Sequence, residues 1–460
     1  MNAKEMPAPF VSTRNACKLC APLGACFAMR GIEGCIPLIH GSQGCSTYIR
    51  RYGISHFREP IDIASSNFTE STAIFGGRDN LVAAIDNVTR QYHPTAIGIT
   101  STCLSETIGE DVPMYLRNYL AGRDAGRAGV LGLKPIVFYA STPSYRGTHM
   151  DGFHEAVYAA VSALTRPAHA QTGRINLISG FVSAEDLREV HRILRSYGRD
   201  YTLLPDYSKT LDGVSWETYQ KLPEGGTPIA AIAAMSEACA TIALGHALPA
   251  EKNAARWLET EHAVPAKYVE LPIGIGNTDA FFDALTAVAQ QEMPAEWVED
   301  RGRVVDAYID GHKYVAGKRA ILYGEEDFVV AMAGFLDEIG MVPVIAATGA
   351  VSSAFAARIE AATPHARGQA KAIADTDFST MLEIAEPLRP DIVIGSSKGY
   401  YLARNLKIPM VRCGFPIHDR IGGHRILHLG YRGTLNLFER ICNAVMEAQQ
   451  LAASSGWTYI

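Results

Sequence analysis

The sequence lacks long uninterrupted apolar runs, and it has no excess of basic residues. No stretch approaches the ~18 consecutive apolar residues that a membrane-spanning helix needs, so we expect no membrane span. The 42 lysine and arginine residues are outnumbered by 48 aspartate and glutamate residues, giving a net charge of −6. This balance argues against a protein that binds nucleic acid through a basic surface.

Two further absences concern targeting and nucleotide binding. Residues 1–10 include Lys4 and Glu5 and no apolar core of a secretory signal, so we expect a cytoplasmic, reducing location. The chain contains no G-x-x-x-x-G-K-[ST] motif, which argues against ATP binding through a P-loop. Gly274 and Gly276 lack the third glycine of a dinucleotide-binding fingerprint, and we interpret them as part of a turn.

Cysteine is unevenly distributed: five of the nine cysteines fall within the first 45 residues. An odd number in a chain without a visible signal is a poor disulfide framework. Cys239 and Cys442 stand in helix-like apolar patterns, where a free cysteine serves as a small buried hydrophobe. The N-terminal group needs a different explanation. It comprises Cys17, Cys20, Cys26, Cys35 and Cys45.

Short apolar runs bounded by turn residues recur along the chain and are typical of buried parallel strands. They cover residues 96–100, 135–140, 175–179, 201–204, 228–233, 319–323, 342–346, 391–395 and 408–411. Helical patterns lie between them, for example at 79–91, 184–197 and 327–339. This alternation predicts an α/β protein with parallel sheets. Breaks near 166–173 and 311–317 predict three α/β domains, at 1–170, 171–312 and 313–460.

Three cysteines stand where loops leave the predicted elements. Cys20 is followed by Pro22 and Gly24, which we interpret as a turn; Cys45 ends the glycine-rich loop HGSQGC; and Cys103 follows the strand AIGIT. Thiolates favour zinc or iron–sulfur clusters, and a cubane cluster or structural zinc takes four ligands. Either Cys17 or a second chain must then complete the set. On spacing alone, a zinc site and buried structural cysteines stay open.

At these residues the sequence resembles the β subunit of the nitrogenase catalytic component and its relatives. The matching blocks include CAPLGACFAMRGIEGCIPLIHGSQGCSTYIR, SHFREPIDIASSNFTESTAIFGG, STCLSETIGEDVP, STPSYRGTH, EDRGRVVD and VRCGFPIHDR. The resemblance implies three Rossmann-like domains. It also implies that Cys20, Cys45 and Cys103 hold half of an [8Fe–7S] P-cluster-like iron–sulfur cluster, which an α-like partner completes, and that Ser144 can bind the oxidised cluster. A turn hydroxyl after Pro143 is the alternative for Ser144.

The resemblance implies two further sites. Phe75 matches the aromatic residue on which the ATP-hydrolysing iron protein docks, with ordinary core packing as the alternative. Asp306 and Asp310 are four residues apart on a predicted helix, so their carboxylates share one side and repel unless solvated or bridged by a cation. In the family this pair and the position of Glu59 form a divalent-metal site between β subunits.

The resemblance therefore predicts an electron-relay subunit of an α2β2 heterotetramer, with catalysis in the partner chain and none here. Only 19 residues precede Cys20, a short form shared with alternative nitrogenases, methylthio-alkane reductase and cofactor-assembly scaffolds. Retention of all three cysteines favours a catalytic complex, and we favour methylthio-alkanes as substrate. A dinitrogen-reducing β subunit and a scaffold subunit are the alternatives, and a heme- or zinc-binding module is a more distant one.

Overall fold

The computed structural model describes residues 17–126, 129–130, 132–249 and 251–454; residues 1–10, where we predicted no signal, lie outside them. The described residues form three sheets, and every strand pairing within them is parallel. The predicted α/β class with parallel sheets is confirmed. No helix in this part of the chain is both long and apolar enough to cross a membrane.

The first sheet has the order β2-β1-β3-β4. Its strands are β1 (Cys35–His40), β2 (Ala64–Ser65), β3 (Ala96–Ser101) and β4 (Ile136–Ala140). Seven helices accompany it: α1 (Ala21–Arg30), α2 (Gln43–Phe57), α3 (Glu70–Phe75), α4 (Arg78–Tyr92), α5 (Cys103–Thr107), α6 (Val112–Asp124) and α7 (His149–Leu164).

The second sheet has the order β6-β5-β7-β8. It comprises β5 (Ile175–Ile178), β6 (Tyr201–Leu204), β7 (Ala240–Leu244) and β8 (Ala266–Val269), with α8 (Ala184–Ser196), α9 (Ile229–Ala233), α10 (Ala254–His262), α11 (Ile275–Ala289) and α12 (Ala295–Val315).

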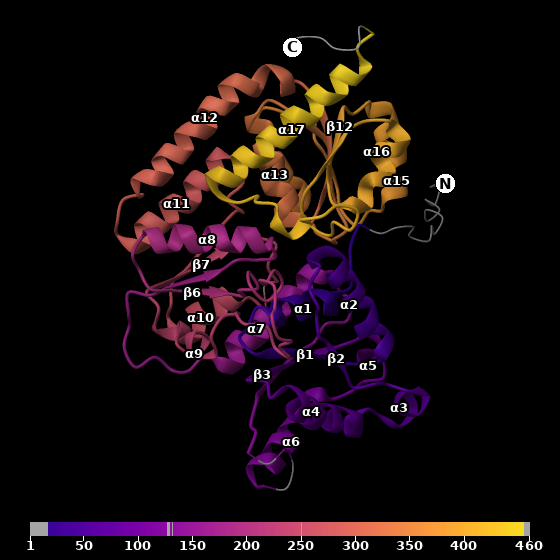
Figure 1. The fold of residues 1–460 in the computed structure, drawn as a ribbon, viewed down its shortest axis with the longest axis vertical. Helices are drawn as coiled ribbons and strands as arrows, with labels where there is room; N and C mark the ends of the chain where they lie inside the picture. The colour runs from indigo at the N-terminus through magenta and orange to yellow at the C-terminus, as the bar shows by residue number, and fades with distance from the viewer. Residues whose placement is uncertain (1–16, 127–128, 131, 250, 455–460) are drawn as a thin grey trace, which may run out of the picture.

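The third sheet has the order β11-β10-β9-β12-β13. It comprises β9 (Arg319–Gly324), β10 (Val342–Thr348), β11 (Lys371–Ile373), β12 (Ile392–Gly395) and β13 (Met410–Arg412), with α13 (Glu326–Glu338), α14 (Phe355–Ala362), α15 (Phe378–Ala385), α16 (Tyr400–Leu406) and α17 (Gly430–Ala452). The three sheet units lie around a common centre, with the first at lower right in Figure 1 and the third above it.

Most predicted strands are confirmed, and the exceptions have physical causes. Residues 228–233 form α9 instead of a strand, because Pro228 occupies the helix N-cap and alanine is the strongest helix former. The predicted ranges do not include β1, β2, β7, β8 or β11. β1 is a central strand that contains Pro37, a residue usually confined to edge strands. Cys239 lies outside any helix, half-buried just before β7, whereas Cys442 is buried in α17 as predicted.

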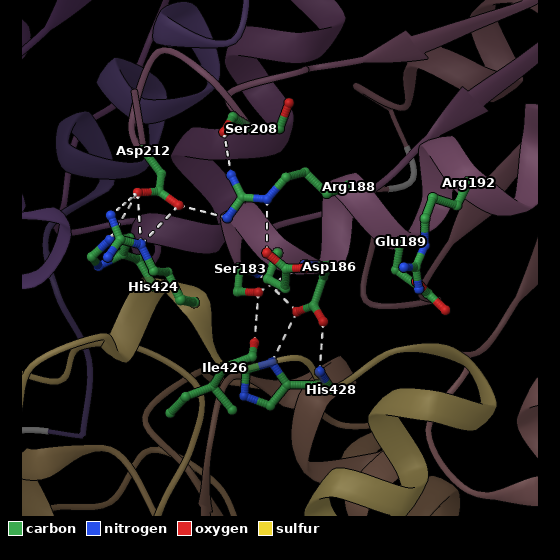
Figure 2. Close-up of polar contacts among 12 residues, drawn as sticks. Ser183, Asp186, Arg188, Glu189, Arg192, Ser208, Asp212, His424, Ile426 and His428 are labelled. Atoms are coloured by element: carbon green, nitrogen blue, oxygen red, sulfur yellow. Dashed lines mark hydrogen bonds and ion pairs between the residues drawn. The ribbon is translucent and has the colours of Figure 1, made fainter. Parts of the chain in front are cut away.

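A seam of buried polar contacts holds the second unit against the chain just before α17 (Figure 2). Asp186 on α8 accepts hydrogen bonds from the His428 N–H at 2.6 Å and the His428 ring Nδ1 at 2.9 Å. Asp212 accepts from His424 and Arg425 of the same C-terminal loop and from Arg188 of α8. The predicted domain limits at 170 and 312 stay predictions; residue 312 falls within the last turn of α12.

Candidate cluster-ligand site

The topology of the first sheet brings two of the predicted ligand cysteines together. From β1 the chain crosses through α2 to β2 on one side, and β3 lies on the other side of β1. Ligands in open α/β sheets bind at such a switch point, beyond the carboxyl ends of the strands. Cys45 follows the end of β1 and Cys103 follows the end of β3. Both thiols therefore lie at this sheet edge.

Helix starts surround the thiols. Cys20 is the N-cap of α1, and Cys45 lies in the first turn of the 15-residue α2. The free N–H groups and the dipole of a helix N-terminus favour a thiolate over a thiol. The Leu23 N–H donates to the Cys20 carbonyl oxygen at 3.1 Å and lowers the pKa of the Cys20 thiol, and the Ser42 hydroxyl lies 3.7 Å from the Cys45 sulfur. These donors would stabilise negative charge on the sulfur atoms once a bound cation has displaced the thiol protons.

Cys45 and Cys103 are near enough to Cys20 for their charges to act on its sulfur. The pKa of Cys20 is raised to about 11, chiefly by burial and to a smaller degree by the charges of Cys45 and Cys103, while the Leu23 N–H lowers it. Three thiolates gathered without a counter-charge repel one another. Iron ions would supply that counter-charge, and they would lower the pKa of the thiols because a bound cation favours the deprotonated form of its ligands.

The three predicted ligand cysteines are more accessible than the four buried cysteines, and Cys17 and Cys239 share the intermediate exposure of Cys20 and Cys45. Cys20 and Cys45 are half-buried and Cys103 is exposed. Four others are buried: Cys26, Cys35, Cys413 and Cys442. Thiols that reach the surface of one chain can bind a cluster that a second chain also binds. The residues present therefore fit an iron–sulfur cluster that lies partly outside this subunit.

Cys17 does not join the group. Desolvation raises its pKa to about 12, and the other groups that shift it are Glu325, Lys398 and two backbone N–H groups of the third unit, with no cysteine among them. Its side chain packs against the apolar core of the third sheet. The hypothesis that Cys17 completes a four-ligand set in this chain has no support in this geometry.

The predicted turn after Cys20 is wrong. Pro22 lies in the first turn of α1, where its missing N–H costs nothing, and Gly24 lies inside that helix. A Cβ on Gly24 would lie 1.7 Å from the carbonyl oxygen of His149 on α7. The glycine is needed because α1 and α7 touch backbone to backbone, which fixes the position of Cys20.

Ser144 lies beside the same helix start. Its hydroxyl oxygen accepts a hydrogen bond from the Ala21 N–H at 3.1 Å, directly after Cys20 in the chain. Sequence reasoning missed Tyr48, whose pKa is raised by burial, by Tyr52 and by the charge of Cys20. The two tyrosine rings lie 4.6 Å apart. The available signal was the spacing on α2, because Tyr48 lies three residues after Cys45 and Tyr52 lies four residues after Tyr48, on one side of the helix.

Phe75 ends α3 and is 86% exposed, and its neighbour Ile74 is 75% exposed. The alternative of ordinary core packing for Phe75 is therefore excluded. α3 lies at the outer edge of the first unit (Figure 1). Two adjacent exposed apolar side chains at a helix end form a small surface that suits contact with another protein.

The predicted divalent-metal residues do not gather within one chain. Asp306 and Asp310 lie on the outer side of α12, whereas Glu59 follows α2 and accepts a hydrogen bond from the Gly213 N–H at 3.1 Å. α2 and α12 lie on opposite flanks of the molecule (Figure 1). Among the described residues, no three histidine, cysteine or carboxylate side chains form a group that could hold a metal ion.

Comparison with known proteins decides the family. The model of the family described as nitrogenase component 1 type oxidoreductase matches residues 20–446. The chain belongs to the nitrogenase component 1 family. The nitrogenase molybdenum-iron protein beta chain of Clostridium pasteurianum is 36% identical over 434 residues, covering 94% of this chain and 93% of the relative. That of Frankia alni is 36% identical over 448 residues, covering 95% and 83%.

Solved structures of the family agree. A chain of nitrogenase Cp1 at pH 6.5 superimposes with a TM-score of 0.93 at 34% identity, covering 100% of this chain and 99% of that one. A chain of nitrogenase Cp1 at pH 5, at 17% identity and a TM-score of 0.69, shares the fold alone. This component 1 family member is thus a β-type oxidoreductase subunit.

Proposed function

We propose that this β-type subunit relays electrons through a P-cluster-like [8Fe–7S] iron–sulfur cluster that it shares with an α-like partner. Cys20, Cys45 and Cys103 hold this chain's half of the cluster. The observation that carries the proposal is that three thiols, none of them fully buried, stand at three helix starts of the first unit, with the charges of Cys45 and Cys103 acting on Cys20. Three ligands are too few for a closed site, so a second chain must supply the rest.

The cluster accepts and releases single electrons when bound, and the chain's own residues set the conditions. The Ser42 hydroxyl lies 3.7 Å from the Cys45 sulfur, and the Leu23 N–H lowers the pKa of Cys20; donors of this kind stabilise negative charge on sulfur and so tune the reduction potential. Ser144, tied to the Ala21 N–H, holds a hydroxyl beside Cys20 that serves as a further oxygen ligand.

The exposed Phe75 surface supports docking of an ATP-hydrolysing iron protein, which delivers the electrons.

On α12, Val298 and Ile309 are 51% and 74% exposed, and Val305 lies between them on the same face. This apolar stripe supports contact between two β subunits in an α2β2 heterotetramer. Asp306 and Asp310 next to the stripe would then meet Glu59 of the second copy and bind a divalent cation there.

For the substrate of the complex we propose methylthio-alkanes, whose carbon–sulfur bond the partner's cofactor would reduce. The relatives are named for nitrogenase, and dinitrogen is the second candidate. A scaffold role in cofactor assembly is the third. Supply of the iron protein and ATP to the purified heteromer, with each substrate in turn, separates all three, because a scaffold reduces neither.

The test of the cluster proposal is the iron and sulfide content of the purified heteromer. We expect Cys45→Ala and Cys103→Ala to lose most cluster iron and turnover while the far-ultraviolet circular dichroism stays near that of the unmodified protein. Cys239→Ala is the matched control, since Cys239 lies half-buried before β7 and outside the ligand group. Full iron content and activity in Cys45→Ala would end the proposal.

A further inference from the structure

A set of buried polar contacts joins the turn after Phe75 to the two strand ends that precede Cys45 and Cys103. Its centre is Glu110, which follows α5 in the chain and whose side chain is only 4% exposed. A buried carboxylate needs hydrogen-bond donors to offset its desolvation. The identity of those donors shows what Glu110 holds together.

One carboxylate oxygen holds the turn between α3 and α4. Glu110 Oε1 accepts a hydrogen bond from the Gly77 N–H at 2.8 Å, two residues after Phe75. A Cβ on Gly77 would lie 2.5 Å from the ring of Phe68 and 3.0 Å from the ring of His40. The turn thus packs directly on His40 with no room for a side chain.

The other carboxylate oxygen holds the end of β1. His40 is fully buried, and its Nε2 lies 3.1 Å from Glu110 Oε2. Its Nδ1 lies 3.1 Å from the hydroxyl of Ser66, which already accepts a hydrogen bond from the Gly41 N–H. An ionised Glu110 carboxylate can only accept, so the proton of a neutral His40 ring lies on Nε2, facing Glu110, and the Ser66 hydroxyl donates to Nδ1. Burial lowers the pKa of His40, which favours the neutral ring, while the contact with Glu110 acts in the opposite direction.

The same histidine contacts the second ligand loop. The His40 carbonyl oxygen accepts a hydrogen bond from the Thr102 hydroxyl at 3.1 Å. Thr102 is the N-cap of α5, whose first residue is Cys103. The Glu110 N–H in turn donates to the Ser105 carbonyl of α5 at 3.1 Å. Both ligand loops and the Phe75 turn are therefore connected through two buried side chains.

We propose that Glu110 is a positioning residue that couples the Phe75 turn to the strand ends carrying Cys45 and Cys103, so that a protein docked on Phe75 shifts the ligand thiols. This inference rests on the proposed electron-relay function. Movement of the turn pulls on Glu110 and hence on His40, because packed interiors transmit displacement instead of absorbing it.

The test compares Glu110→Gln with a control of the same chemistry. Glutamine keeps the length but offers one acceptor oxygen, so the Gly77 N–H and the His40 Nε2–H can no longer both donate. The control is Asp337→Asn in the third unit, where a buried carboxylate likewise accepts from a histidine ring and a backbone N–H, those of His365, at 2.7 and 3.1 Å.

Three measurements on the assembled heteromer are decisive. In Glu110→Gln we expect amide hydrogen exchange of the segment around Gly77 to rise about tenfold, and electron transfer from the iron protein to slow about tenfold. Iron content and reduction by a small chemical reductant, which needs no docking, should stay unchanged. Asp337→Asn should change neither the Gly77 exchange nor the transfer. In combination with Phe75→Ala, the loss should be smaller than the product of the single losses.

Faster exchange at Gly77 without slower transfer would reduce Glu110 to a structural role and overturn the proposal. So would transfer in Glu110→Gln equal to that of Asp337→Asn. If Glu110→Gln does not assemble, Glu110→Asp, which keeps the charge but shortens the reach, decides by the same comparison. Absence of iron from the unmodified heteromer would instead refute the electron-relay function itself.

Discussion

Asp186 offers the sharpest energetic prediction, because its carboxylate closes the seam between the second unit and the C-terminal loop. Only 1% of Asp186 is exposed, and it accepts four hydrogen bonds: from Ser183 N–H, His428 N–H, His428 Nδ1 and Leu429 N–H. Burial alone would raise its pKa, but these donors lower it below the usual range. The carboxylate is therefore ionised, and each of its two oxygens accepts two hydrogen bonds. Figure 2 shows its contacts with Ser183 and His428.

Asp186→Ala removes every acceptor and leaves buried backbone donors without partners. Each orphaned donor costs about 1–3 kcal/mol, and four donors lose their acceptor in this variant. These costs overlap, so we expect a loss of about 3–5 kcal/mol in the free energy of unfolding. Asp186→Asn keeps the shape and one oxygen, and should lose about 1–3 kcal/mol.

Urea unfolding of the full chain, followed by circular dichroism and tryptophan fluorescence, measures these losses. Asp283→Ala on the exposed side of α11 is the control and should stay within about 0.5 kcal/mol of the unmodified chain. A difference between Asp186→Ala and Asp283→Ala of less than about 1 kcal/mol would refute the reasoning about the seam.

Three further predictions follow from single positions. Burial holds the pKa of His56 well below its usual range. The contribution of His56 to the free energy of unfolding is therefore complete above about pH 6.5 and is lost at lower pH, where the unfolded chain takes up the proton. His56→Gln should reduce the dependence of the free energy of unfolding on pH by up to about 1.4 kcal/mol per pH unit, and an equal dependence in both proteins would contradict this reasoning. Gly24→Ala should cost about 3 kcal/mol or more and lower cluster iron, because the methyl group meets the His149 carbonyl; unchanged melting would contradict it. Phe75→Ala should raise the half-saturating concentration of iron protein about tenfold without changing stability, and unaltered saturation would remove Phe75 from the docking surface.

Much of the fold could be predicted because its signals are local. Buried parallel strands appear as short apolar runs, and residues 96–100, 175–179 and 391–395 all coincide with observed strands. β1 was lost because Pro37 contradicts the local rule, although pairing on both sides stabilises the strand. α9 was misassigned because a five-residue apolar run carries no period that separates helix from strand.

The sequence by itself determined the α/β class, the place of Cys103 after a strand, and the family resemblance, since each depends on residue type and local spacing. Only the tertiary structure decided that Cys17 turns away from Cys20, that Gly24 meets α7, and that Glu110 joins His40 to the Phe75 turn. Some of these contacts link residues more than a hundred positions apart in the chain. Local sequence does not determine which distant segment a side chain will contact.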